Sequence, residues 1–255
     1  MPADMVTGAV VWHDLHTPDP DGARRFFSAL FGWSYSVEHS TNLVWTGREA
    51  DYALIVADGT AHGGIVETGP QNPARWLGFV SVDDVDRATD RAITSGGHIE
   101  KSPFDVPGVG RSSVLKDPEG GTICPFKASH AYAPATSVFA SNLLHGENAA
   151  NTKEFYKVVC HWQVATPSTK TQTGVLKFQT AQGALAALVL PRRITAIAEA
   201  GWVPLIASSD VEASIAKAMT LGARPVLPCT RVKNIGDVAA MLDPCGAAFG
   251  ILCAL

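Results

Sequence analysis

The sequence contains few charged side chains and no strong excess of either sign. Of its 255 residues, 17% are Asp, Glu, Lys or Arg, and 20 basic against 24 acidic side chains give a formal net charge of −4. Two arginine pairs, at residues 24–25 and 192–193, stand alone and form no basic stripe that could neutralise phosphate groups. We therefore expect no nucleic-acid partner.

Long apolar runs and paired cysteines are also missing. The longest purely apolar run, residues 184–190, is far shorter than the roughly 20 residues that cross a bilayer as a helix. The first residues, MPADMVTGAV, do not combine a charged segment with an apolar one, so no secretion signal is expected. Five cysteines without a C-x-x-C spacing argue against a disulfide framework and against a structural zinc site. A soluble, cytoplasmic protein is expected.

Motifs for nucleotide binding and for nucleophilic catalysis are absent from the sequence. GGIVETG and PGVGR are rich in glycine, but neither has the phosphate-binding lysine or the strand-to-helix setting of a nucleotide loop. There is no G-x-S-x-G motif. Hydrophobic residues, in contrast, make up 46% of the chain, which is enough for a large buried core.

An internal repeat is the clearest positive feature. Two Asp-Pro-x-Gly turns, at Asp117 and Asp243, lie 126 positions apart (243 − 117), and each leads into a short apolar segment. The same offset pairs Trp76 with Trp202. Matches at turn and tryptophan positions are what duplicated structure would retain, so the sequence predicts two similar halves.

Each half alternates between helical and strand-like patterns. In residues 19–32, apolar side chains recur at helical spacing, Asp19 can cap the helix and Gly32 supplies a C-terminal stop. Strand-like segments separated by Pro and Gly turns follow. The second half repeats this order, with helices around residues 148–159 and 210–221. The unit βαβββ is expected four times.

Five short motifs stand in order along the first half: W-x-D-L-x-T-x-D from Trp12, F-F-x-x-L-F-G-W from Phe26, V-D-D-V-D from Val82, V-G-R from Val109 and D-P-E-G from Asp117. Together they resemble the vicinal oxygen chelate superfamily, which includes glyoxalase I, bleomycin-resistance proteins and extradiol dioxygenases. Within it, the chain is similar to two-domain glyoxalase-like proteins, some of which are labelled hydroxylases. The resemblance covers nearly the whole chain and is looser after residue 136.

The resemblance implies an α+β fold in which four βαβββ modules form two open-barrel glyoxalase-like domains. We expect the first domain over residues 1–128 and the second, more divergent one over residues 136–255. The stretch 127–137 contains small residues and a proline, as a linker would. Each barrel would hold one cleft.

The resemblance also implies where metal ligands would stand. Relatives that use a metal place ligands on the first strand of a module and a glutamate on the last strand. The corresponding positions here are Trp12, Leu77, Ser141, Val203, Cys124 and Gly250. A divalent cation needs about three donors, typically His nitrogen and carboxylate oxygen. These positions do not supply them, so we expect no family-type metal site and no cofactor.

A displaced metal site stays open as an alternative. Strand periodicity places Trp12, Asp14 and His16 on one face of the first strand, while His62 and Glu67 lie near the strand that would close the same module. His16, His62 and Glu67 could then hold iron, zinc, manganese or nickel. A shift of one residue in strand register would reverse these faces.

Catalysis without a metal is a second alternative. Asp14 could orient His16 as a general base in a lyase, isomerase or hydroxylase-type reaction on a small carbonyl or aromatic compound. The second half keeps a histidine, His145, but has Leu143 where the first has Asp14. If one half is catalytic, it is therefore the first. Arg111 could hold an anionic group of the substrate.

Binding of a small hydrophobic or aromatic metabolite is the function that the sequence favours. Small-molecule clefts are mostly apolar and aromatic, with a few polar groups that fix orientation. The side chains expected to contact a ligand are Trp12, Trp45, Trp76, Phe79, Arg111, Cys124, Phe126, His145 and Trp202. Such walls suit stacking on a planar aromatic compound. No membrane partner is expected, and the sequence leaves monomer and homodimer open.

Overall fold

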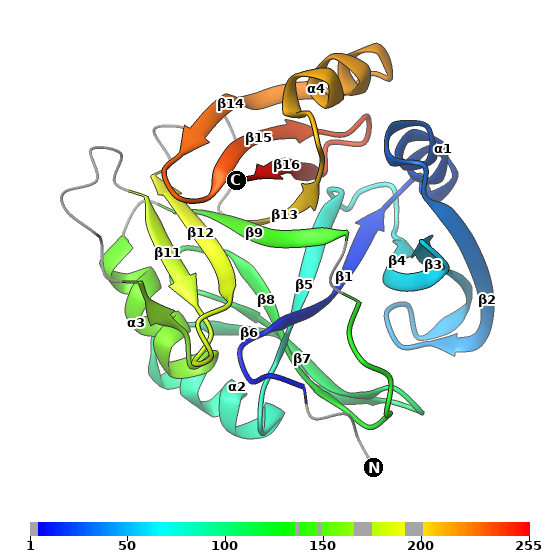
Figure 1. Ribbon diagram of the computed structural model, residues 1–255. Helices are drawn as coiled ribbons and strands as arrows, with labels where there is room; N and C mark the ends of the chain where they lie inside the picture. Colours follow the sequence, from blue (N-terminus) through cyan, green and yellow to red (C-terminus); the bar gives the residue numbers. More distant parts are fainter. Residues whose placement is uncertain (1–4, 136–137, 147–148, 166–174, 192–200) are drawn as a thin grey trace. The chain divides into compact units, whose positions relative to one another are not determined.

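The computed structural model describes residues 5–135, 138–146, 149–165, 175–191 and 201–255. Within these residues the chain forms two eight-stranded mixed sheets and four α-helices (Figure 1). The predicted α+β class is confirmed. Among the described helices, none combines the length and the apolar character that crossing a membrane would require.

The first sheet is built entirely from the first half of the chain. Its elements are β1 (Val10–Thr17), α1 (Pro20–Phe31), β2 (Ser34–Leu43), β3 (Arg48–Ala57), β4 (Thr60–Glu67), β5 (Arg75–Ser81), α2 (Val85–Thr94), β6 (His98–Val106), β7 (Gly110–Lys116) and β8 (Thr122–Ala128). The strand order is β2-β3-β4-β1-β5-β8-β7-β6. β1 pairs with β4 and β5 with β8 in parallel, whereas the hairpin pairs are antiparallel. This pattern is two βαβββ modules.

The second sheet repeats the first in the same order. Its elements are β9 (Phe139–Gly146), α3 (Ala149–Val159), β10 (Gln163–Val164), β11 (Leu176–Gln179), β12 (Leu185–Pro191), β13 (Gly201–Ala207), α4 (Val211–Thr220), β14 (Arg224–Val232), β15 (Gly236–Leu242) and β16 (Ala248–Ala254). The strand order is β10-β11-β12-β9-β13-β16-β15-β14. The prediction of four βαβββ modules, two in each half, is confirmed.

The chain divides into two compact units, and each takes one module from each half. The first unit consists of residues 1–12, 78–134 and 141–202, and the second of residues 13–77, 135–140 and 203–255. The two sheets thus follow the halves of the sequence, whereas the compact units combine modules from different halves. The first unit contains α2 and α3, which lie side by side (Figure 1).

The helix starts follow directly from local sequence. At α1 the Asp19 carboxylate accepts a hydrogen bond from the Gly22 N–H at 2.8 Å, and Pro20 occupies the first turn, where no N–H is needed. Gly32 ends the helix in the left-handed conformation, with φ at 75°, and its N–H donates to the Ser28 carbonyl. Aspartate side chains cap α2 and α4 in the same way.

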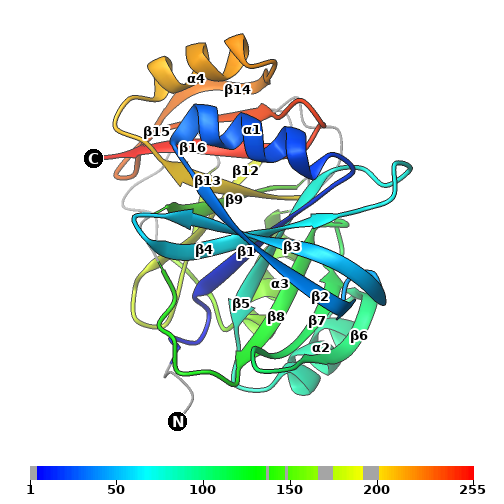
Figure 2. The same ribbon diagram turned by 90° about the vertical axis from the view of Figure 1, so that its right-hand side faces the viewer.

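In the second unit, α1 covers one face of its sheet. Its buried residues are Ala23, Phe26, Phe27 and Leu30. They join a core that includes Leu15 of β1 and Ile65 of β4. α1 also lies beside α4 (Figure 2), where the Lys217 ammonium donates to the Leu30 carbonyl at 3.0 Å. This core determines which face of β1 and β4 is available for a site.

In the first unit, α3 brings Tyr156 into a fully buried aromatic cluster. The Tyr156 ring stacks on Trp162, with 5.2 Å between ring centroids, and meets Trp202 edge-on at 5.3 Å. Its hydroxyl accepts from the Trp202 Nε1–H at 2.8 Å and donates to the Asp117 carboxylate at 2.7 Å. Burial raises the pKa of Asp117, although this hydrogen bond and those from two backbone N–H groups oppose the rise.

Candidate functional site

Alternate residues of β1 and β4 point to opposite sides of the sheet. Leu15 and Ile65 are register partners that face the α1 core. Asp14 is the partner of Gly64, one position earlier on each strand, and therefore faces the other side. His16 faces the same way as Asp14. We call this second side the site face; it carries Asp14, His16, Tyr52 and Gly64.

A buried hydrogen bond joins Asp14 to Tyr52 on the site face. The Tyr52 hydroxyl, from β3, donates to Asp14 Oδ1 at 2.7 Å, and Asp14 is only 2% exposed. The ring of Tyr52 lies directly over Gly64, where an added Cβ would collide with the ring and its hydroxyl. Gly64 is thus needed for space, because any side chain would push Tyr52 away from Asp14.

His16 and Trp45 add an aromatic contact to the site face. Trp45 comes from the loop between β2 and β3 and is half-buried. Its ring meets the buried His16 imidazole edge-on, with 4.8 Å between centroids and an angle of 78°. Two residues that the sequence predicted for the site, from separate segments, are therefore in contact.

His62 of β4 is 3% exposed and lies where the pairing of β3 with β4 is irregular, between Gly63 and Ala61. Burial lowers the pKa of the imidazole; a hydrogen bond with the Ala57 backbone and the charge of Asp58 oppose this shift but are outweighed. Burial therefore favours the neutral form of His62.

Several other predicted ligand contacts belong to the first compact unit. Phe79 of β5 and Phe126 of β8 meet edge-on at 6.1 Å, and Cys124 is the register partner of Phe79. All three are buried. Trp12 precedes Asp14 by two positions on β1 and is half-buried.

Three predicted contact residues, Arg111, Trp76 and Trp202, have other surroundings. The Arg111 guanidinium forms ion pairs with the carboxylates of Asp86, at 2.8 Å, and Asp105, at 3.1 Å. These hydrogen-bonded ion pairs raise the pKa of Arg111. Trp76 and Trp202 pack inside the aromatic clusters of their units. The side chain of His145 lies outside the part of the chain that the structure describes.

The donor groups do not fit the metal of the metal-dependent relatives. Leu77 and Val203 are buried hydrocarbons, and a Cβ at Gly250 would collide with Leu205. Ser141 and Cys124 offer only a hydroxyl and a thiol, from different sheets. A divalent cation would lack the imidazole and carboxylate donors that it prefers.

The three residues of the predicted displaced metal site do not share one face. Glu67 is the register partner of Thr17 and is exposed, whereas His16 is the partner of Val66, on the opposite face. In the described ranges of the chain, no group of three or more His, Cys, Asp and Glu side chains is placed to hold a metal ion.

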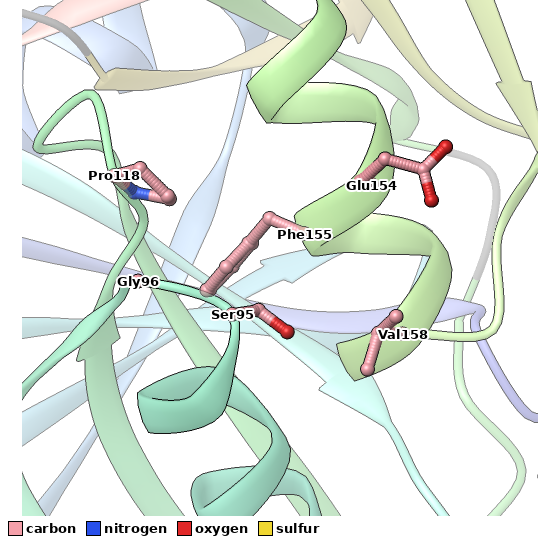
Figure 3. A pocket seen from close by; sticks show the side chains of 6 residues that line it. All are labelled: Ser95, Gly96, Pro118, Glu154, Phe155 and Val158. Carbon is pink, nitrogen blue, oxygen red and sulfur yellow. The ribbon is translucent and has the colours of Figure 1, made fainter.

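A shallow pocket of about 370 Å³ lies in the first unit, between α2 and α3. Figure 3 shows its six lining residues: Ser95, Gly96, Pro118, Glu154, Phe155 and Val158. Phe155 projects from α3 toward the turn after α2, and a Cβ at the neighbouring Gly97 would collide with its ring. One carboxylate among apolar and backbone groups forms no catalytic arrangement, so the pocket reflects helix packing.

The fold of the chain is that of glyoxalase-like proteins. Residues 10–126 match the family model described as "Glyoxalase-like domain". Residues 10–126 thus form a glyoxalase-like domain, and the predicted resemblance of the first half of the chain to glyoxalase-like proteins is confirmed.

The chain is also similar to relatives over nearly their whole length. The chain is 27% identical to "Putative glyoxylase CFP32" of Mycobacterium tuberculosis over 96% of this chain and 94% of the relative. It is also 27% identical to "Anthracycline biosynthesis protein DnrV" of Streptomyces peucetius, over 96% and 93%. Among solved structures, the Mn(II)-bound glyoxalase from Novosphingobium aromaticivorans superimposes with a TM-score of 0.61 at 13% identity, over 96% of this chain and 82% of that one. At this identity the likeness concerns the fold alone.

Sequence reasoning did not single out Tyr52 or Gly64. A glycine inside a strand signals the close approach of another group, and HGGIVE contains two such glycines in a row. The glycines alone do not say which aromatic ring would approach, because that depends on the β3–β4 register, in which Tyr52 pairs with Val66.

Proposed function

We propose that the site face binds a small hydrophobic or aromatic metabolite without the metal of the family. The observation that carries this proposal is the buried Asp14–Tyr52 hydrogen bond laid over Gly64. Burial of a carboxylate costs folding free energy, which a hydrogen bond offsets. Buried ionisable groups with a specific partner are concentrated at functional sites.

The chemistry of the site face supports a planar ligand. The Trp45 ring and the His16 imidazole offer edges and faces for stacking, while Asp14 and Tyr52 supply fixed polar groups. A few oriented polar groups among aromatic side chains are typical of small-molecule sites. The relatives add support, because two of them are named for the biosynthesis of anthracyclines, which are planar polycyclic aromatic compounds.

Calorimetric titration with a panel of soluble naphthalene and anthraquinone sulfonates tests the proposal. We expect at least one compound to bind with a stoichiometry near one per chain in the presence of a chelator. Tyr52→Phe should weaken that binding about tenfold, because it removes the hydrogen bond that orients the Asp14 carboxylate. Glu49→Gln, at an exposed position of β3, is the matched control and should bind as the unmodified protein does.

The proposal would be wrong if no compound bound, or if Tyr52→Phe and Asp14→Asn both left binding unchanged. Binding that appeared only after metal was added would point instead to a metal-dependent site.

Metal-free catalysis at the same face is a second candidate function. The Tyr52 hydroxyl and the Asp14 carboxylate are in direct contact, so the pair could pass a proton to or from a bound carbonyl or aromatic compound. His16, on the same face, could serve as a general base. The reaction class would be that of a lyase, an isomerase or a hydroxylase.

Mass spectrometry of the bound compounds after prolonged incubation separates the two functions. A catalyst converts more than one equivalent per chain, and Asp14→Asn or His16→Ala should abolish the conversion. A protein that only binds returns every compound unchanged, and the same variants affect affinity alone.

A further inference from the structure

We infer that β2 is a docking edge, at which an extended acidic segment of a partner protein adds to the first sheet as a further strand. The partner segment lies along a groove between β2 and α1, where its carboxylates pair with Arg24 and Arg25. This interaction is separate from the proposed ligand site. It follows from the state of the sheet edges and from the charges of the groove.

The outer strands of the two sheets differ in how well they are protected against strand addition. An open edge presents unpaired N–H and C=O groups, and proteins block such edges with short strands, prolines, lysines or bulges. In the described chain β10 is only two residues long. β6 contains Lys101 and Pro103, and its pairing with β7 is irregular on both sides of Lys101. β14 contains Pro225 and Pro228 and is also irregular. These three edges are therefore protected.

β2 lacks these protective features over most of its length. It is 10 residues long and contains neither proline nor lysine. Residues 34–40 pair with β3 without interruption, and the first irregularity follows Ser40. Among the described residues β2 pairs with β3 alone, and residues 36–39 are exposed (Figure 1). Its outer edge is open to a further strand, which is how many proteins bind extended peptides.

An open groove of about 780 Å³ lies between α1 and the first residues of β2. Its walls include Arg24, Arg25 and Ala29 of α1 and Ser34, Tyr35 and Val37 of β2. Val37 points to the α1 side of the sheet, because its register partner Ala53 belongs to the α1 core. Val37 is also 47% exposed. The groove therefore offers a partner an apolar contact beside the open strand edge.

The α1 side of this groove carries a net positive charge. Arg24 forms an ion pair with Asp21, one turn earlier in the helix. The hydrogen bond and the charge of Arg24 lower the pKa of Asp21, and the charge of Arg25 adds to this effect. Arg25 itself is exposed and forms no ion pair with any described residue. One carboxylate thus faces two guanidinium groups, and a carboxylate of the partner pairs with Arg25.

The neighbouring charges define which part of the partner segment is acidic. Glu38 lies on the opposite side of β2, because its register partner is Tyr52 of the site face. His39 already pairs with Asp51 at 2.9 Å and with Glu49 at 3.1 Å. The acidic residues of the partner therefore lie beside the first residues of β2, next to the two arginines.

A second copy of the chain suits this edge less well than an acidic segment does. Pairing of two β2 strands would bring the groove of each copy against that of the other, so that Arg24 and Arg25 of both copies would approach one another. Like charges at such a contact repel. An acidic segment meets no such opposition.

Fluorescence anisotropy with three labelled peptides tests the inference. The first is acetyl-Thr-Glu-Val-Glu-Val-Glu-Thr-amide, whose glutamates share one face of an extended chain. The second carries N-methyl groups on the amides of all its glutamates and valines, which prevents strand pairing at unchanged charge. The third has lysine in place of glutamate. We expect only the first to bind, with a dissociation constant below about 100 μM, and to protect the β2 amides from hydrogen exchange.

Two variants test the groove itself. Arg25→Gln should weaken binding of the acidic peptide about three- to tenfold, because it removes the guanidinium that has no ion-pair partner among the described residues. Val37→Asp should weaken it as well, since it adds a like charge to the groove and leaves both arginines in place. Arg87→Gln, at an exposed position of α2, is the matched control and should bind as the unmodified protein does.

Equal binding of the N-methylated peptide would show that charge alone attracts the peptide, and would overturn the inference. The same conclusion follows if the acidic peptide does not bind at concentrations up to about 1 mM, or if Arg25→Gln leaves its affinity unchanged. A dimer in sedimentation experiments, with β2 amides protected before any peptide is added, would make a second copy the occupant and would also overturn it.

Discussion

Tyr156 and Phe27 are structural counterparts that differ by one hydroxyl group. Each stacks on the tryptophan that follows its own helix, with the same 5.2 Å between ring centroids. Each also meets a second tryptophan edge-on, at 5.3 Å for Trp202 and at 5.7 Å for Trp76. Only the tyrosine bonds its partners: Trp202 donates to Tyr156, whereas Trp76 Nε1 has no partner among the described residues.

Removal of the Tyr156 hydroxyl should destabilise the protein. Tyr156→Phe would leave the Asp117 carboxylate and the Trp202 N–H buried without this partner. The expected loss is about 1–3 kcal/mol of unfolding free energy, measured by urea denaturation. A loss below roughly 0.5 kcal/mol would show that the two hydrogen bonds of the Tyr156 hydroxyl, with Asp117 and Trp202, contribute no net stability.

The opposite substitution should stabilise the second unit. Phe27 and Trp76 meet edge-on as Tyr156 and Trp202 do, so we expect the hydroxyl of Phe27→Tyr to accept from the Trp76 N–H. Asp243 occupies the position of Asp117 in the sequence repeat and is the expected acceptor for this hydroxyl. We expect a gain of about 0.5–1.5 kcal/mol in the same denaturation experiment. A loss of stability would mean that the surroundings of Phe27 have no room for the added oxygen.

Asp243 should make stability fall as the pH rises above about 4. Burial raises the pKa of this carboxyl from 3.8 to about 6, despite hydrogen bonds from the backbone of Cys245, Gly246 and Ala247. A folded-state pKa above the unfolded one means that its stabilising contribution is complete below pH 3.8 and is lost as the pH passes through 6. The loss is at most about 3 kcal/mol.

Asp243→Asn is the matching variant, because its amide oxygen can still accept from the Cys245 and Ala247 N–H groups. The difference in unfolding free energy between this variant and the unmodified protein should change in the variant's favour between pH 4 and 6. Asp90→Asn, on the exposed side of α2, controls for the loss of a carboxylate. If the difference in unfolding free energy between Asp243→Asn and the unmodified protein did not change with pH, the raised pKa of Asp243 would be contradicted.

Gly64→Ala should damage both the fold and the site. The added methyl would collide with the Tyr52 ring, so that Tyr52 must leave Asp14 or the strands must separate. We expect a loss of about 1–3 kcal/mol in stability and weaker binding of the naphthalene probes. Gly78→Ala is the control, because its new Cβ would meet only the Val10 side chain, at 3.8 Å. Equal behaviour of the two variants would exclude a special role for Gly64.

Most of the fold could be predicted from the sequence because its signals are local. α1 begins after Asp19 and ends before Gly32, as the sequence pattern indicated. Both signals are local, because a side-chain cap and a left-handed glycine act within one turn. The repeated turns at Asp117 and Asp243 precede β8 and β16, each the last strand of its sheet in chain order. Periodicity also placed Asp14 and His16 on one face of β1.

The site itself was less accessible to sequence reasoning. Tyr52 reaches Asp14 only because the register of β3, β4 and β1 brings residues 38 positions apart together over Gly64. The ion pairs of Arg111 likewise form only because the fold brings Asp86 of α2 and Asp105 of β6 close to its guanidinium. Strand register has no signature within a single strand, so these contacts could not be read from the sequence.

The sequence by itself determined the four βαβββ modules, the glyoxalase-like character of the first half and the residue types at the positions where metal-dependent relatives place their ligands. Tertiary structure alone decided how the modules combine, with each compact unit taking one module from each half. The physical reason is that modules of one superfamily all have similar apolar helices and strands. Which helix packs with which then depends on how side chains distant in sequence fill space together, as Tyr156 of α3 does with Asp117 of the first sheet.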